Sequence, residues 1–154
     1  MSRTNPRVPL DHPRRFQIAL KIDAPPDRVW EVMTSVELWP EWTESVDEVK
    51  RLDSGPLRIG SRVRIKQPKF LAAVWEVTEL DPSRSFTWVM RRPGIIASAK
   101  HRVQRSGQGS HAELSVTYTG FLGTLVAQIF AGITDRYLMM EAAGLKQRSE
   151  IFVR

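Results

Sequence analysis

The feature that most restricts the fold is a long proline-free segment near the C-terminal end. No proline occurs from residue 121 to residue 150, and apolar residues recur there at intervals of three and four, which predicts one amphipathic helix. Such a helix would be about 40 Å long, and it needs a second apolar layer to pack against. Its predicted apolar stripe consists of Leu122, Val126, Ile129, Phe130, Ile133, Tyr137, Met140 and Gly144.

Short segments that alternate apolar and polar residues fill most of the preceding chain. In residues 15–23, for example, Phe16, Ile18, Leu20 and Ile22 alternate with polar or small residues, as in a half-buried strand. Turn clusters such as Ser106-Gly107-Gln108-Gly109 separate the segments, which is typical of an antiparallel meander. The six further predicted strands are residues 46–53, 61–67, 72–80, 85–91, 96–105 and 112–119.

Two short helices are predicted between the first strand and the second. Asp23 is a suitable N-cap for the first helix, and Pro25 and Pro26 fit in its first turn, where a missing N–H costs little. Residues 35–43 predict a second, broken helix in which two tryptophans flank a proline. Packing against the sheet, or a place at the mouth of a pocket, would account for these tryptophans.

Composition places the chain among single-domain globular proteins. It has 154 residues, and we expect one domain over 15–154 after a disordered, Pro- and Arg-rich arm over 1–14. No apolar run is long enough to span a membrane and no secretory signal is visible, so we expect a cytoplasmic protein. A monomer and a homodimer are both compatible with the sequence.

Several kinds of chemistry have no support in the sequence. The absence of cysteine excludes disulfides and thiolate catalysis, and three scattered histidines do not suggest a metal site. No GxGxxG, P-loop, HExxH or GxSxG motif occurs, so we expect no cofactor. The net charge of +6 is dispersed, and alternation of Arg62, Arg64 and Lys66 with less polar residues predicts a solvated sheet face rather than a nucleic-acid site.

Four segments resemble the SRPBCC superfamily, which includes START-like and polyketide cyclase/dehydrase-like proteins. They are Ile22 to Trp30, Trp39 to Thr43, Trp75 to Pro82 followed by Phe86-Thr87-Trp88, and the strand that carries His101. The resemblance covers about residues 15–150. It implies an α+β helix-grip fold: a seven-stranded curved antiparallel sheet wrapped around a long C-terminal helix, with two short helices after the first strand. It also implies a cavity for a hydrophobic ligand, while leaving the function open.

The alternation of residues along the strands predicts which side chains would line such a cavity. Residues that share one face of a strand point to the same side of the sheet, although a bulge would reverse that assignment. The predicted ligand-binding residues are Val63, Ile65, Trp75, Val77, Phe86, Trp88, Met90, His101, Val103, Tyr118, Ile133, Tyr137 and Met140.

Three of these residues are also the candidates for chemistry. His101 has a side chain that can take or give a proton near neutral pH, and it lies in an apolar strand pattern. Tyr118 and Tyr137 can each donate a hydrogen bond to a ligand carbonyl or an enolate. The alternative for His101 is a core histidine bonded to a neighbour, and for the tyrosines it is plain packing.

Three functional hypotheses follow from these residues. The first is a binding protein that holds a lipid, a polyketide or an aromatic-like molecule between the sheet and the helix. The second is a polyketide cyclase or dehydratase that uses general acid and base residues in the same cavity. The third is a basic interaction module for nucleic acid or a membrane, although no nucleic-acid partner is expected. An enzyme differs from a carrier in holding two polar groups within reach of one reacting centre.

Overall fold

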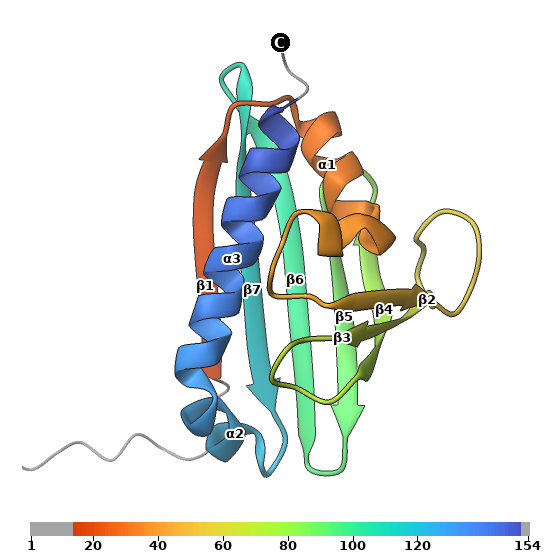
Figure 1. The fold of residues 1–154 in the computed structure, drawn as a ribbon, viewed down its shortest axis with the longest axis vertical. Helices are drawn as coiled ribbons and strands as arrows, with labels where there is room; N and C mark the ends of the chain where they lie inside the picture. Colours follow the sequence, from red (N-terminus) through yellow and green to blue (C-terminus); the bar gives the residue numbers. More distant parts are fainter. Residues whose placement is uncertain (1–13, 152–154) are drawn as a thin grey trace, which may run out of the picture.

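The structure is a computed structural model that describes residues 14–151. Seven strands form a single curved sheet, and helices cover one of its faces (Figure 1). The strands are β1 (Arg14–Ile22), β2 (Glu48–Arg51), β3 (Arg62–Lys66), β4 (Ala73–Asp81), β5 (Ser85–Arg92), β6 (Ile95–Ser106) and β7 (Gly109–Thr119). The helices are α1 (Pro26–Thr34), the 3-10 helix η1 (Val36–Glu41), α2 (Gly123–Ile129) and α3 (Ala131–Glu150).

The sheet is antiparallel throughout, with the strand order β1-β7-β6-β5-β4-β3-β2. Each strand pairs with its neighbour in sequence, except that β1 returns to pair with β7. Figure 1 shows α3 running along the sheet over β1 and β7, with α1 beside its C-terminal half. The predicted α+β helix-grip fold, with its two short helices after the first strand, is confirmed.

Alternation along the strands separates a covered face from an exposed one, as the sequence predicts. Val63 and Ile65 are buried, whereas Arg62 and Arg64 are exposed on the opposite face. A bulge in β4 shifts the register between Val77 and Glu79. The bulge follows Trp75 and Val77, so the predicted face of these earlier residues is unaffected.

The predicted N-cap of α1 is wrong. The cap position is Pro25, whose backbone is extended, and no side chain caps the helix. Asp23 instead donates its backbone N–H to Oε1 of Glu150 over 2.8 Å. Lys146 donates to the same carboxylate, and these hydrogen bonds hold the pKa of Glu150 below its usual value although burial opposes the shift. Glu150 therefore fastens the end of α3 to the turn that follows β1.

The prediction of one continuous C-terminal helix over residues 121–150 is wrong in one respect. The helix is interrupted at Phe130. The backbone of Phe130 is not helical, and α2 ends and α3 begins on either side of it. Ile129 of the predicted stripe lies at the end of α2 and is 64 % exposed. The buried residues of α3 are Thr134, Tyr137, Leu138, Ala142, Gly144, Leu145 and Ser149.

Gly144 explains how closely the helix layer packs. A β-carbon at this position would lie 2.0 Å from the backbone oxygen of Trp42, so only glycine fits. At Gly132 an added β-carbon would meet nothing within 4 Å. The close packing of α3 on the segment at Trp42 therefore requires glycine at position 144 and not at position 132.

No helix within residues 14–151 is long and apolar enough to cross a membrane. The predicted arm lies outside the described residues except for Arg14, which begins β1 rather than ending the arm. His12 also lies outside them. The predicted single domain over 15–154 stays a prediction.

Candidate functional site

Two adjoining compartments lie between the sheet and the helix layer. The inner compartment has a volume of about 80 Å³ and is enclosed by β5, β6, β7, η1 and α3. The outer compartment has a volume of about 320 Å³ and opens near α2. Gln67, Phe70, Trp75 and Tyr118 border both compartments, together with Ile65. The two spaces therefore form one site with a narrow deep end and a wider mouth.

A histidine and a carboxylate meet at the deep end. His101 on β6 and Glu141 on α3 lie 2.8 Å apart, measured from Nε2 to Oε1. Their side chains are only 4 % and 15 % exposed. When Glu141 is ionised it can only accept, so Nε2 carries the proton. Nδ1 has no hydrogen-bond partner within the described residues, and a second buried N–H there would be unsatisfied. His101 is therefore joined to Glu141 through Nε2 alone.

Aromatic rings hold the imidazole in one orientation. Phe86 stacks on it with centroids 4.5 Å apart and ring planes inclined by 8°. Trp39 and Trp88 lie beside it at centroid distances of 5.4 and 5.6 Å. The apolar surroundings strengthen any electrostatic interaction that His101 makes. Trp39 is itself buried and donates its indole N–H to the backbone of Met33, so η1 forms one wall of the site.

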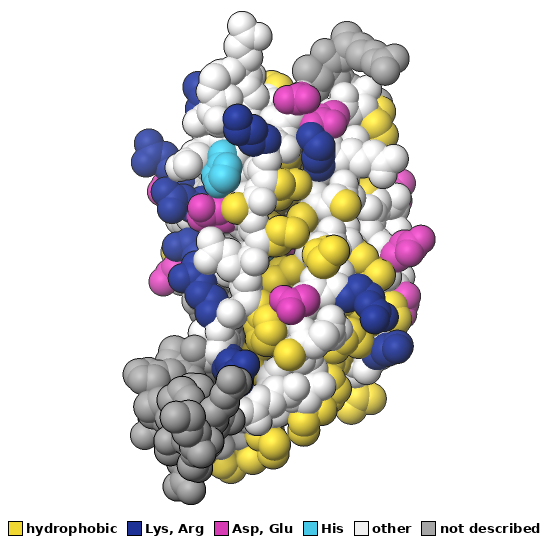
Figure 2. All heavy atoms as spheres, turned by 90° about the vertical axis from the view of Figure 1, so that its left-hand side faces the viewer, with side chains coloured by type: hydrophobic (Ala, Val, Ile, Leu, Met, Phe, Trp, Pro, Cys, Tyr) yellow, Lys and Arg dark blue, Asp and Glu magenta, His cyan; other side chains and the backbone are white. Residues whose placement is uncertain are grey.

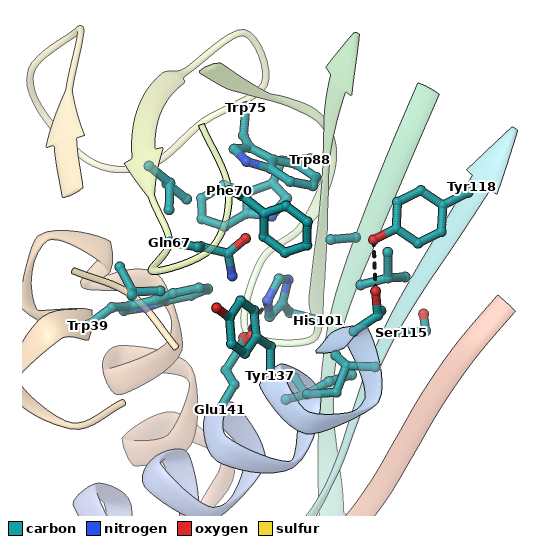
Figure 3. Close-up of a pocket in the computed structure, with 17 residues that line it drawn as sticks. Trp39, Gln67, Phe70, Trp75, Trp88, His101, Ser115, Tyr118, Tyr137 and Glu141 are labelled. Carbon is teal, nitrogen blue, oxygen red and sulfur yellow. Dashed lines mark hydrogen bonds and ion pairs between the residues drawn. The ribbon is translucent and has the colours of Figure 1, made fainter. Parts of the chain in front are cut away.

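One face of α3 supplies the opposite wall. Thr134, Tyr137, Leu138 and Glu141 follow at helical intervals and all line the inner compartment. The hydroxyl of Tyr137 accepts a hydrogen bond from the backbone N–H of Lys69 over 3.2 Å. Because that oxygen is the acceptor, the hydroxyl proton is left to be donated elsewhere. Figure 3 shows Tyr137, Glu141 and His101 grouped on one side of the cavity, with Gln67 above them.

Tyr118 contributes a second phenol, farther towards the mouth. Its hydroxyl lies 3.1 Å from Oγ1 of Thr134. Burial raises the pKa of Tyr118, and the hydrogen bond with Thr134 only partly opposes that rise. Tyr118 therefore keeps its proton at neutral pH and can act as a hydrogen-bond donor.

Phe70 separates the two compartments. It belongs to the segment between β3 and β4, and its ring packs against Phe130 and Tyr137 at centroid distances of 5.3 and 5.8 Å. The outer compartment is lined mainly by apolar side chains, with Lys69 and Arg92 as its cationic members. Arg92 donates to the backbone oxygen of Ala72, which joins this segment to β5.

The structure divides the predicted cavity residues into groups. Ile65, Trp75, Trp88, His101, Tyr118 and Tyr137 line the inner compartment. Met90 lines the outer compartment only. Val63, Val77, Phe86 and Val103 are fully buried in the core beneath the cavity. Ile133 and Met140 line neither compartment, because they lie at the edge of the α3 face that lines the site. That face runs through Thr134, Tyr137, Leu138 and Glu141.

Sequence reasoning missed Glu141, Phe70 and Thr134. Glu141 was detectable in principle, because it follows Tyr137 by four residues and so shares its helix face. The predicted stripe counted only apolar residues, and a carboxylate on that face has no apolar signal. Phe70 lies between two strands, where no periodicity indicates the direction of a side chain.

The comparisons with known proteins agree with this architecture. Residues 13–150 match the model of a family described as "Polyketide cyclase / dehydrase and lipid transport". The chain belongs to this family. The predicted SRPBCC, polyketide cyclase/dehydrase-like membership is therefore confirmed. No curated protein sequence is similar enough to this chain to count as a match.

Solved structures of similar shape include a cyclase and a START superfamily protein. The Zhui aromatase/cyclase from Streptomyces sp. R1128 is 18 % identical with a TM-score of 0.76, over 93 % of this chain and 97 % of that one. A START superfamily protein from Mycobacterium smegmatis is 12 % identical with a TM-score of 0.69, over 87 % and 97 % of the two chains. At these identities the likeness shows the fold alone.

Proposed function

We propose that this protein binds a hydrophobic, polyketide-like or aromatic molecule and catalyses its cyclisation or dehydration by proton transfer at His101 and Glu141. The observation that carries the proposal is their 2.8 Å contact at the closed end of a largely apolar cavity. A carrier needs no such pair, whereas an enzyme needs polar groups within reach of one reacting centre. The family and the structural neighbours support ligand binding or cyclase activity without naming a ligand.

The arrangement suits removal of a proton next to a carbonyl group. The carboxylate of Glu141 takes the proton from the α-carbon, and the O–H of Tyr137 donates to the oxygen on which charge develops. In a dehydration, the C–O bond to a β-hydroxyl group then breaks. The proton taken by the pair returns to the departing oxygen, so water leaves and the pair regains its starting state. In a cyclisation, the same enolate carbon attacks a second carbonyl.

The volumes indicate how a substrate would lie. About 80 Å³ is less than the ~150 Å³ of a cavity that binds benzene, so the inner compartment takes only the reacting end of a molecule. The outer compartment, at about 320 Å³, falls at the lower limit of typical ligand pockets and would hold the hydrophobic body.

Dehydration of 3-hydroxy-1-tetralone tests the proposal with a defined reaction. This bicyclic β-hydroxyketone loses water and tautomerises to 1-naphthol, whose fluorescence reports the rate. We expect the native protein to accelerate the reaction, and Glu141→Gln and His101→Gln to lower kcat by about 10²–10⁴-fold. The matched control is Glu44→Gln, at an exposed position outside the cavity lining. Equal rates in native protein and Glu141→Gln would refute the catalytic role.

A carrier of a hydrophobic molecule or lipid is the second candidate function. The apolar lining and larger volume of the outer compartment favour it, because they bind a hydrophobic body without any chemistry. Native mass spectrometry of the purified protein, before and after organic extraction, distinguishes the two. A bound molecule released unchanged, together with no turnover of the tetralone, would support the carrier.

A further inference from the structure

A group of exposed apolar side chains surrounds the mouth of the outer compartment. We call this group the α2 patch; it consists of Leu71, Phe121, Leu122, Leu125 and Ile129. Figure 2 shows hydrophobic side chains gathered at the lower end of the molecule, the end at which Figure 1 places α2. Phe121 is 86 % exposed and Leu71 is 78 % exposed. Exposed apolar groups of this kind mark a surface that meets a partner.

Helix α2 is apolar on both of its sides. Gly123 and Ala127 are buried against the sheet, and Val126 lines the cavity. Leu122, Leu125 and Ile129 follow at intervals of three and four on the side that faces away. A surface helix normally carries charged residues on its outer side, whereas the outer side of α2 carries these apolar residues and the uncharged, exposed Gln128. The outer side of α2 therefore lacks a covering layer in the described part of the chain.

The patch is continuous with the site. Leu122 donates its backbone N–H to the backbone oxygen of Gly94, in the turn between β5 and β6. The side chains of Phe121 and Leu122 pack over that glycine. Leu71 is both an exposed member of the patch and part of the outer compartment's lining. A molecule that leaves the outer compartment would pass directly along this surface.

Most charges at this end are positive. Residues 66–75, 90–98 and 117–134, which form most of it, contain no Asp or Glu, and the exposed Asp135 follows them in α3. Exposed cations flank the patch instead: Arg14, Arg15, Lys69, Arg91 and Arg92. Arg91 is paired with Glu76, which lies on the sheet beyond this end. A second copy of the chain docked symmetrically on the patch would bring these like charges together, which opposes dimerisation there.

We infer that the α2 patch docks on an anionic lipid membrane, with its apolar side chains inserted into the interface and the flanking cations against acidic headgroups. Interfacial attachment of this kind combines buried apolar area with attraction to anionic lipid. Docking would place the cavity mouth at the acyl-chain boundary, where a hydrophobic ligand enters or leaves without crossing water. The inference does not depend on catalysis at His101 and Glu141.

Co-sedimentation with lipid vesicles tests the inference. We expect the full chain to bind phosphatidylcholine vesicles that contain phosphatidylglycerol, to bind pure phosphatidylcholine vesicles much less, and to be released at high ionic strength. The double variant Leu125→Gln/Ile129→Gln should bind at least about tenfold less. Lys69→Gln should bind about fivefold less.

A matched control separates docking from a general loss of surface hydrophobicity. Ile59 is 63 % exposed, as against 64 % for Ile129, and it lies in the segment between β2 and β3. Ile59→Gln should therefore bind vesicles like the native protein. Unchanged binding by the double variant would overturn the inference. So would concentration-dependent self-association that the double variant abolishes, because a second copy would then occupy the patch.

Discussion

At the scale of single residues, the site depends on polar groups held in apolar surroundings. His101 is fixed by a stacked Phe86 and by Glu141, and each restricts the imidazole in a different way. A ring that cannot rotate needs no reorganisation when charge develops beside it. The proposed proton transfer depends on this fixed orientation of His101.

Tyr118 gives a pH dependence whose direction follows from its burial. Its folded pKa lies above the value of about 10 for an exposed tyrosine. Above that pH the unfolded chain loses its phenolic proton first, so the Tyr118 contribution to stability falls as pH rises towards the folded pKa. Denaturant titrations of native protein and Tyr118→Phe from about pH 8 to pH 11 measure it. The native protein should lose more stability than the variant, and parallel curves would contradict the assignment.

Phe70 controls the passage between the compartments. Phe70→Ala removes the ring that packs against Phe130 and Tyr137, so the two spaces should merge. We expect a fluorescent apolar probe such as anilinonaphthalene sulfonate to bind more tightly, and stability to fall by about 2–4 kcal/mol. Leu71→Ala is the control in the same segment, because Leu71 is 78 % exposed. If Phe70→Ala bound the probe more weakly and had an unchanged free energy of unfolding, the ring of Phe70 would not separate the two compartments.

At the scale of elements, the sequence predicted the strands and their inward faces well. Period-two alternation identified Ile65, Trp75 and Trp88, because every second residue of a strand points to the same face of the sheet. The buried face of the C-terminal helix was harder to predict, because the predicted stripe assumed one continuous helix. The break at Phe130 has no proline or cap signal. The stripe also took the wrong side of Tyr137, because it included Ile133 and Met140 rather than Thr134 and Glu141. Glu141 was not predicted, because the stripe was defined by apolar residues alone.

The glycines of α3 provide a matched pair of variants. Gly144→Ala would place a β-carbon 2.0 Å from the backbone oxygen of Trp42, so α3 or η1 must move. We expect a loss of about 2–3 kcal/mol in the free energy of unfolding. Gly132→Ala meets nothing within 4 Å, and should gain about 0.5–1 kcal/mol from helix propensity. Chemical denaturation measures both, and equal effects of the two substitutions would contradict the close packing of α3 on η1.

At the scale of the whole molecule, the curved sheet and α3 enclose a space that has two different ends. The closed end carries the His101–Glu141 pair, and the open end is surrounded by the α2 patch and exposed cations. This difference between the two ends of the cavity could not be deduced from the sequence. The curvature of the sheet and the angle of the helices decide where space remains between them. The fold itself was predictable, because segment order and spacing together resemble one superfamily.

Solvent hydrogen exchange into 1-tetralone tests the central claim most directly. This ketone has α-protons but no hydroxyl to lose, so exchange in deuterium oxide isolates proton removal from every later step. NMR should show that the native protein accelerates exchange at the α-carbon, and that Glu141→Gln reduces the acceleration by about 10²-fold or more while still binding the ketone. Binding of the ketone by the native protein without any acceleration of exchange would contradict proton transfer in this cavity and leave the protein a carrier.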